Sequence, residues 1–312
     1  MPANLKDLRT RIRSVRNTEQ ITKAMKLVST AKFGRAQISV VQAKPYSCAL
    51  VKMVRDVVAN LGDGATHPLM HPSTSDVSHI VVVSSERGLC GSYNSQVTKQ
   101  AFRTIAEEIE AGRKVAVTCL GKKSFQSLSR SLGAKGFVSK QCSLDELAKN
   151  SDKVFEQGVI RLVTTPHEKR AKLFADEFSR ALASGYETGS FGKLVFVYTR
   201  FESIGSRPLV VETFLPFANT QLKHDQAAGE PEFEPSAEVL LNALLPRYLG
   251  TAFFQLLLEA VASEHASRMS AMDSASRNAK EMLRKLQITY QRARQAAITR
   301  ELIEIVSGAE AL

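Results

Sequence analysis

Apolar residues near the C-terminus recur at alternating steps of four and three residues. They do so within a stretch, Thr251 to Ser307, that contains neither Gly nor Pro. This alternation is typical of a left-handed coiled-coil seam, and an unbroken helix over the stretch would be roughly 85 Å long. Globular helices average about three turns, so we expect a helical rod that projects from a compact domain. The seam positions are Phe254, Leu258, Val261, His265, Arg268, Met272, Ala275, Ala279, Met282, Leu286, Thr289, Ala293 and Ala296.

This predicted seam is only partly apolar. His265, Arg268 and Thr289 interrupt it, and four of its positions are Ala. Small seam residues allow a second helix to approach closely, but they bury little apolar area and therefore stabilise the pair weakly. Taken alone, the pattern also fits a coiled coil with a purely structural role.

A second long helix is predicted at the N-terminus, where only Gly34 breaks the helical pattern between Pro2 and Pro45. We expect this helix to continue, with a kink at Pro45, to about Asn60, and the Gly-Asp-Gly at 62–64 to end it. Its apolar stripe shifts phase after four members, and the two parts are Leu5, Leu8, Ile12 and Val15, then Ile21, Met25 and Val28. The two terminal helices are predicted to pair as an antiparallel coiled coil.

Between the two helices, short apolar runs of strand length alternate with amphipathic helical segments. This alternation predicts an α/β domain with a largely parallel sheet, and the last two strands form a hairpin at one edge. The order of the strands cannot be read from the sequence. The predicted strands are His79–Ser84, Lys114–Leu120, Gly136–Ser139, Val159–Val163, Leu194–Tyr198 and Leu209–Phe214. The predicted helices are Gln96–Ala111, Lys122–Leu132 and Glu168–Gly185.

The predicted fold class is therefore α/β, with an antiparallel coiled coil of long N- and C-terminal helices and a central Rossmann-like domain. The expected division is an N-terminal coiled-coil helix at 1–60, a linker at 61–78, the α/β domain at 79–230 and a C-terminal coiled-coil helix at 231–312.

The formal net charge is +11, and it is concentrated at the N-terminus, where residues 1–60 carry twelve Lys or Arg against three Asp or Glu. A basic helix indicates nucleic acid, an anionic membrane surface or an acidic protein partner. Only Phe33 and Tyr46 supply aromatic rings in this segment, which argues against nucleic acid. An acidic protein partner fits a projecting rod better. No uncharged apolar stretch is long enough to span a membrane.

Candidate chemistry is sparse. The turn RGLCG after the first predicted strand has one Gly-x-x-Gly, which is weak evidence for a phosphate-binding loop. A structural or partner-contacting turn is the preferred interpretation, and Cys90 is interpreted as a packed thiol rather than a nucleophile. The four cysteines are widely spaced and no HExxH motif occurs. We therefore expect no catalytic residues, no cofactor, no metal and reduced thiols.

Three stretches of the chain resemble the gamma subunit of F-type ATP synthases, the central rotor shaft. They are residues 12–36 (IRSVRNTEQITKAMKLVSTAKFGRA), residues 84–94 (SSERGLCGSYN), and the C-terminal pair 263–283 (SEHASRMSAMDSASRNAKEML) and 294–312 (RQAAITRELIEIVSGAEAL). The strings are long and specific, and they lie in both predicted long helices and in the middle domain.

This resemblance implies a non-catalytic shaft, present once per complex. Its coiled coil would turn inside a ring of three alpha and three beta subunits, and its α/β domain would form a foot on the membrane c ring beside the epsilon subunit. Ion flow would turn the ring and the shaft, and the shaft would drive ATP synthesis, or be driven by hydrolysis, at the beta subunits.

The resemblance also implies which residues meet the partners. Met25, with Lys23 and Lys26, would face an acidic lever of the beta subunit, and the apolar tail at 303–312 would sit in a bearing at the top of the ring. Contacts to the beta-subunit catch region would come from Arg268, Gln295, Thr299 and Glu301. The foot contacts to the c ring and epsilon would involve Gly88, Cys90, Gly91, Phe233, Glu234 and Pro235.

Two further expectations concern location and the alternative function. The motif begins almost at Met1, and the close cysteine pair of plant chloroplast relatives is missing. Both features favour a bacterial protein, peripheral on the cytoplasmic face of the plasma membrane. The alternative is the matrix side of a mitochondrial inner membrane. The rival function is an independent α/β nucleotide-binding module with a coiled-coil arm, in which Gly88 or Gly91 would be needed to bind ATP.

Overall fold

The structure is a computed structural model, and it describes residues 5–61, 67–143, 146, 155–164, 170–217, 233–234 and 236–310. The chain forms two compact units. The smaller unit comprises residues 1–31 and 268–312, and the larger comprises residues 32–267. Among the described residues, no helix combines the length and apolar character needed to cross a bilayer.

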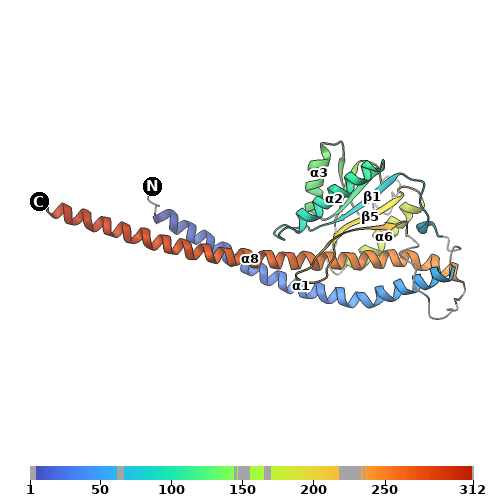
Figure 1. Cartoon of the computed structure of the whole chain (residues 1–312), viewed down its shortest axis with the longest axis horizontal. Coiled ribbons are helices and arrows are strands. Elements are labelled where there is room, and N and C mark those ends of the chain that lie inside the picture. The colour runs from blue at the N-terminus through green and yellow to red at the C-terminus, as the bar shows by residue number, and fades with distance from the viewer. Residues whose placement is uncertain are drawn as a thin grey trace. The chain divides into compact units, whose positions relative to one another are not determined.

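The N-terminal helix has about the length that its pattern predicts, whereas the C-terminal helix extends beyond both ends of the Gly- and Pro-free stretch from Thr251 to Ser307. Helix α1 runs from Leu5 to Leu61 and helix α8 from Ala237 to Glu310 (Figure 1). Gly34 interrupts only the sequence pattern, and the helix continues through it and through Pro45, as expected for one helix to about Asn60. A single Gly costs a helix only about 1 kcal/mol relative to Ala, which is too little to end a helix of this length.

Helix α8 begins 14 residues before the Gly- and Pro-free stretch at Thr251, so Pro246 and Gly250 both lie inside it. Gly250 packs closely against helix α6 (Ala171–Glu187). A Cβ atom built on Gly250 would lie 3.0 Å from the Ser179 hydroxyl oxygen and 3.3 Å from an Asp176 carboxylate oxygen. Close packing of the two helices is therefore the reason for a helix-weakening residue at this position.

The larger unit contains a six-stranded sheet with the order β3-β4-β2-β1-β5-β6. All neighbouring strands are parallel except β5 and β6, which form the antiparallel hairpin predicted at one edge. The third strand lies two residues later than predicted. The strands are β1 (Val77–Val83), β2 (Lys114–Leu120), β3 (Val138–Cys142), β4 (Val159–Val163), β5 (Lys193–Thr199) and β6 (Leu209–Leu215).

Helices cover both faces of this sheet (Figure 1). Helices α2 (Tyr93–Glu110) and α3 (Lys122–Gly133) pack on one face, while α6, the first part of α8 and the last turns of α1 share a core with the other. Strands buried on both faces need apolar side chains at successive positions, which explains why the predicted strands are continuous apolar runs. Residues 62–66 of the predicted linker lie outside the described residues, and a short 3-10 helix, η2, follows at Pro68–Met70.

A buried histidine lies inside this core. His79 of β1 is fully buried, and its Nε2 atom lies 2.8 Å from the Thr118 hydroxyl oxygen of β2. The rings of Phe155 and Phe191 pack edge-on against the imidazole, and Arg161 of β4 is buried nearby. Burial first, and the charge of Arg161 second, lower the pKa of His79 to about 3. His79 is therefore neutral in the folded chain at physiological pH.

We predict that acidification destabilises the α/β domain through His79. Because the pKa of His79 is lower in the folded chain than in the unfolded chain, the unfolded chain binds the proton first, and the free energy of unfolding falls as the pH drops below about 6.5. Between pH 7.5 and pH 5 the expected loss is about 2 kcal/mol. Urea unfolding across this pH range measures the loss.

The variant His79→Gln keeps a polar atom near Thr118 but does not titrate. It should lose most of the pH dependence of the free energy of unfolding, whereas the exposed control His71→Gln should keep it. Equal slopes in both variants would contradict the assignment to His79.

Candidate partner-binding surface

The smaller unit is an antiparallel pair of helical segments from α1 and α8. Lys26 Nζ lies 2.6 Å from Asp273 Oδ1, and Arg9 Nε donates to Tyr290 Oη at 2.7 Å. Moving back along α1 from Lys26 to Arg9 therefore moves forward along α8, as the predicted antiparallel arrangement requires. The Arg9 guanidinium also lies 5.5 Å from the centre of the Tyr290 ring. The Lys26 ammonium group lowers the pKa of the Asp273 carboxyl group, which also forms an ion pair with Arg277.

The predicted phase shift on α1 is wrong. The side chains of Ile21 and Val28 are 60% and 57% exposed, whereas those of Thr22 and Ser29 are 8% and 3% exposed. The buried positions of α1 continue at alternating steps of three and four residues from Leu5 onward. Beyond Val15, several of these buried positions are polar residues, and the apolar residues Ile21 and Val28 lie on the exposed side. Thr22 is tolerated there because its hydroxyl donates to carbonyl oxygens of its own helix. If the 3-4 spacing of the first four apolar residues is continued along the helix, it passes through Thr22 and Ser29 and predicts that Ile21 and Val28 are exposed.

The seam of α8 also departs from its prediction beyond Ala279. Met282 is 54% exposed and Thr289 is exposed, while Leu283 is buried and Tyr290 is half-buried. Two consecutive steps of four residues therefore follow Ala275, in place of the strict 3-4 alternation. A straight helix has 3.6 residues per turn, so a seam that keeps to 3.5 drifts, and an extra step of four corrects the drift by local unwinding.

As a result, the outer surface of the unit carries both apolar and cationic side chains. Its exposed large apolar residues are Ile21, Leu27, Val28, Met282, Ile288, Ile298, Leu302, Ile303, Ile305 and Val306. Its exposed cations are Lys6, Arg9, Arg11, Arg13, Arg16, Lys23, Arg277, Lys280, Arg284, Lys285, Arg292, Arg294 and Arg300. Exposed apolar side chains in such number mark a surface that binds another protein, and the cations favour an acidic one.

The residues predicted to contact the alpha and beta subunits occupy three environments. Lys23, Gln295, Thr299 and Glu301 are exposed. Met25 and Lys26 are half-buried, and Arg268 is only 8% exposed. The Thr299 hydroxyl donates to the Gln295 carbonyl oxygen at 2.9 Å, so its proton is already used within the helix. The predicted tail at 303–312 is helical to residue 310, and its last two residues lie outside the described part.

The predicted foot residues Gly88, Cys90 and Gly91 belong to the turn between β1 and α2. Cys90 is buried, and its sulfur atom accepts a hydrogen bond from Asn94 Nδ2 at 3.1 Å. The same Asn94 accepts from the Ser85 backbone N–H at 3.1 Å. These bonds fix the shape of the turn and account for a packed rather than reactive thiol.

The other predicted foot residues precede α8. Phe233 is half-buried against the core that contains α6 and α8, and Glu234 is exposed. Pro235 lies outside the described residues.

The carboxyl ends of β1 and β2, where α/β folds commonly bind ligands, lie in close contact. Gly121 has a φ of +120°, and a Cβ atom built on it would lie 2.4 Å from the Ser84 carbonyl oxygen. The Ser84 and Ser124 hydroxyl groups are 2.7 Å apart. These contacts close the space between Ser84 and Gly121.

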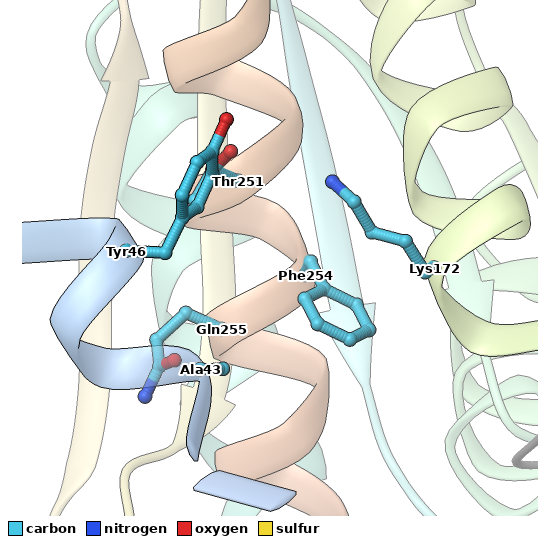
Figure 2. A pocket seen from close by; sticks show the side chains of 6 residues that line it. All are labelled: Ala43, Tyr46, Lys172, Thr251, Phe254 and Gln255. Atoms are coloured by element: carbon cyan, nitrogen blue, oxygen red, sulfur yellow. The ribbon is translucent and has the colours of Figure 1, made fainter. Parts of the chain in front are cut away.

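Cavities occur elsewhere in the larger unit. One of about 270 Å³ lies among α1, α6 and α8, and there Lys172 Nζ is 5.3 Å from the centre of the Phe254 ring (Figure 2). The residues around it are Ala43, Tyr46, Lys172, Thr251, Phe254 and Gln255. Another, of about 340 Å³, is lined by Ser47, Cys48, Val51, Lys52 and Arg55 of α1. Among the described residues, no three His, Cys, Asp or Glu side chains are grouped so that they would hold a metal ion.

Comparisons with known proteins agree over the full length of the chain. A family model described as ATP synthase matches residues 4–312. The ATP synthase gamma chain of Geobacter metallireducens is 39% identical over 312 residues, and the match covers 99% of each chain. The chain belongs to the ATP synthase gamma chain family. The gamma chain of Cytophaga hutchinsonii is 37% identical, over 100% of this chain and 99% of its own. The predicted resemblance to gamma subunits is confirmed.

Solved structures share the fold of this gamma-chain family member. A chain of the Euglena gracilis mitochondrial ATP synthase, in a structure of OSCP, F1 and c-ring, aligns with a TM-score of 0.63. It is 18% identical, and the alignment covers 98% of this chain and 94% of that one. A chain from the central stalk and c-ring of the Tetrahymena thermophila enzyme aligns with a TM-score of 0.54 at 22% identity, covering 82% and 99% of the two chains. The predicted α/β fold with long terminal helices is confirmed.

We predict that the ion pair between Lys26 and Asp273 holds the two helical segments together. Asp273→Lys places two cations side by side, so trypsin should cut residues 5–31 several times faster, and the exchange Lys26→Asp with Asp273→Lys should restore the slower rate. The control is Glu281→Lys, because Glu281 pairs with Lys285 at 2.8 Å on the same helix and joins no second segment. If both single variants are cut equally fast, the ion pair does not close the pair of helices.

Proposed function

We propose that the chain is the central shaft of an F-type ATP synthase. Its two-helix unit turns inside a ring of three alpha and three beta subunits and couples ion-driven rotation of the c ring to ATP synthesis or hydrolysis. The observation that carries this proposal is that polar residues of that unit are buried between the helices while large apolar residues are exposed. Thr22 and Ser29 are buried, and Ile21 and Val28 lie on the outer surface. Family membership supports it, and so do solved structures of similar fold that are described as central stalk and rotor.

In this role the chain catalyses no reaction itself, and the chemistry takes place on the alpha and beta subunits. The closed carboxyl ends of β1 and β2, with Gly121 pressed against Ser84, support this part of the proposal. The shaft acts by making different contacts with each conformation of an otherwise identical partner, because only differential contacts shift a conformational equilibrium.

The outer surface suits a shaft that exchanges partners. The exposed cations attract acidic residues of the surrounding ring at every rotational position. Such contacts between solvated charges form and break with little change in free energy. Among the predicted contact residues, Lys23 is the most available to an acidic lever, because Lys26 is already paired with Asp273. Lys26 would then exchange its ion pair with Asp273 for one with a partner carboxylate when that carboxylate approaches. Met25 would lie beside them.

Near the C-terminus, Gln295, Thr299 and Glu301 are proposed to contact the beta-subunit catch region, where their exposed side chains are accessible. Arg268 is buried, so its proposed contribution is to shape the surface that the beta subunit meets. The apolar side chains from Ile298 onward would seat in the bearing of the ring.

We propose that the α/β domain is the foot that meets the c ring and the epsilon subunit, through the turn at Gly88, Cys90 and Gly91 and the segment at 233–235. The chain is then peripheral to the membrane and present once per complex. Since the matched gamma chains quoted above are bacterial, the cytoplasmic face of a bacterial plasma membrane is the proposed location, with the matrix side of a mitochondrial inner membrane as the alternative.

Reconstitution with alpha and beta subunits tests the proposal. The full chain should join a complex containing a single copy of it, and that complex should hydrolyse ATP rapidly. Failure of the chain to join the ring, together with saturable ATP binding by the chain alone, would replace the shaft with the nucleotide-binding alternative.

A matched pair of variants tests the outer surface. Ile21→Asp places a carboxylate where we expect an acidic partner, so ATP hydrolysis by the complex should fall about fivefold or more, which corresponds to an interface loss of about 1 kcal/mol. The control is Ile109→Asp on α2, which makes the same change at a 46% exposed isoleucine of the α/β domain. An unchanged hydrolysis rate in Ile21→Asp, or an equal loss in both variants, would refute the assignment of this surface.

A further inference from the structure

The end of the β5–β6 hairpin reaches both long helices within the larger unit. Arg200 and Phe201 follow β5 directly. Arg200 Nε lies 3.9 Å from Glu259 Oε2 of α8, and the ring of Phe201 lies 5.5 Å from that of Phe33 of α1, edge to face. Two adjacent residues of one hairpin therefore contact two different helices.

Arg200 is held in place by the sheet as well as by α8. Its Nη2 atom donates to Tyr198 Oη at 3.0 Å and to Glu212 Oε2 at 3.1 Å, and Tyr198 Oη donates to the same carboxylate at 3.0 Å. The guanidinium group thus joins β5, β6 and α8. A planar guanidinium can make several such contacts at once, which an ammonium group on a flexible chain cannot reproduce.

The receiving carboxylate on α8 is also held in a fixed position. The side chain of Glu259 is only 16% exposed, and Gln255 Nε2 donates to its Oε1 atom at 3.1 Å. Burial raises the pKa of Glu259. Charge interactions are stronger where water is partly excluded, so the contact from Arg200 counts for more than a pair on the open surface.

A third contact to the long helices comes from the segment that follows β1. Tyr93, the first residue of α2, donates through its hydroxyl group to the Ala260 carbonyl oxygen of α8 at 3.3 Å. Because β1 and β5 are parallel neighbours, the segments that follow them leave the same edge of the sheet. We call the set of Tyr93, Arg200 and Phe201 the collar. It meets α8 at two successive residues, Glu259 and Ala260, and α1 at Phe33.

We propose that the collar is where torque passes between the α/β domain and the two long helices, with Arg200 as the positioning residue. This inference rests on the proposed shaft function. Both helices already share the buried core of the larger unit with the sheet. The collar adds polar and aromatic contacts beyond that core, to α1 by aromatic packing and to α8 by a charge and a hydrogen bond, so a rotation of either helix against the sheet breaks one of these contacts.

The test is the ratio of ions pumped to ATP hydrolysed by the complete ATP synthase in membrane vesicles. Replacing both Arg200→Ala and Phe201→Ala should lower this ratio at least threefold while the complex still contains the variant chain and still hydrolyses ATP. A merely destabilised complex would lose pumping and hydrolysis in proportion, which leaves the ratio unchanged. Arg200→Lys, which retains the charge but not the planar fork, should recover part of the ratio.

The matched control is Arg113→Ala. The Arg113 side chain is 45% exposed against 43% for Arg200, and it pairs with Glu108 of α2 at 3.7 Å rather than with a long helix. Its ratio should equal that of the unaltered complex. If the double Ala variant does not assemble, Glu259→Gln with Phe33→Leu tests the same contacts from the helix side.

The outcomes separate the two proposals. An unaltered chain that neither assembles nor pumps refutes the shaft function itself. An unaltered chain that pumps, with collar variants that assemble and keep the same ratio, refutes the collar alone. A loss in Arg113→Ala equal to that in the collar variants also refutes the collar.

Discussion

The structure depends on the continuity of α8, which is one hydrogen-bonded helix from Ala237 to Glu310 although its two parts belong to different compact units. An unbroken helix fixes the direction of each side chain relative to the last, at 3.6 residues per turn. Within the larger unit the helix presents a core face from Leu241 to Leu257, and within the smaller unit it presents a coiled-coil seam beyond Arg268. Pro246 and Gly250 both lie in the first part, where packing against the sheet and α6 offsets their cost to the helix.

The same continuity determines which residues of the helix pair are free to meet a partner. Globular proteins ordinarily place apolar residues inside and leave polar ones outside. In α1 the register puts Thr22 and Ser29 inside and leaves Ile21, Leu27 and Val28 exposed. A seam of this composition gains little from apolar burial, and cross-links such as the Lys26 and Asp273 pair contribute in its place. The apolar area that the pair does not bury remains for contacts with another protein.

The parts of the fold that could be predicted are those governed by burial on a repeating pattern. The inner strands β1, β2, β4 and β5 are recognisable because both of their faces are covered, which favours continuous apolar runs, whereas the edge strand β3 is largely exposed. The order of the strands depends on pairings between distant segments, which no local pattern encodes. Gly34 does not end α1, because local propensity is weak against the rest of a long helix. The apolar pattern of α1 predicts the wrong seam beyond Val15 because the helical register, occupied there by Thr22 and Ser29, determines burial.

The α/β domain also uses an edge of its sheet in an unusual way. In folds of this kind, ligands bind beyond the carboxyl ends of the parallel strands. Here the carboxyl end of β2 is closed by the contact between Gly121 and Ser84, and the segments after β1 and β5 carry Tyr93 and Arg200 to α8. This edge is attached to α8 through a backbone carbonyl oxygen and a largely buried carboxylate, and both contacts would be lost if the helix moved away. In this way an architecture that is typical of nucleotide-binding domains is suited to holding a long helix.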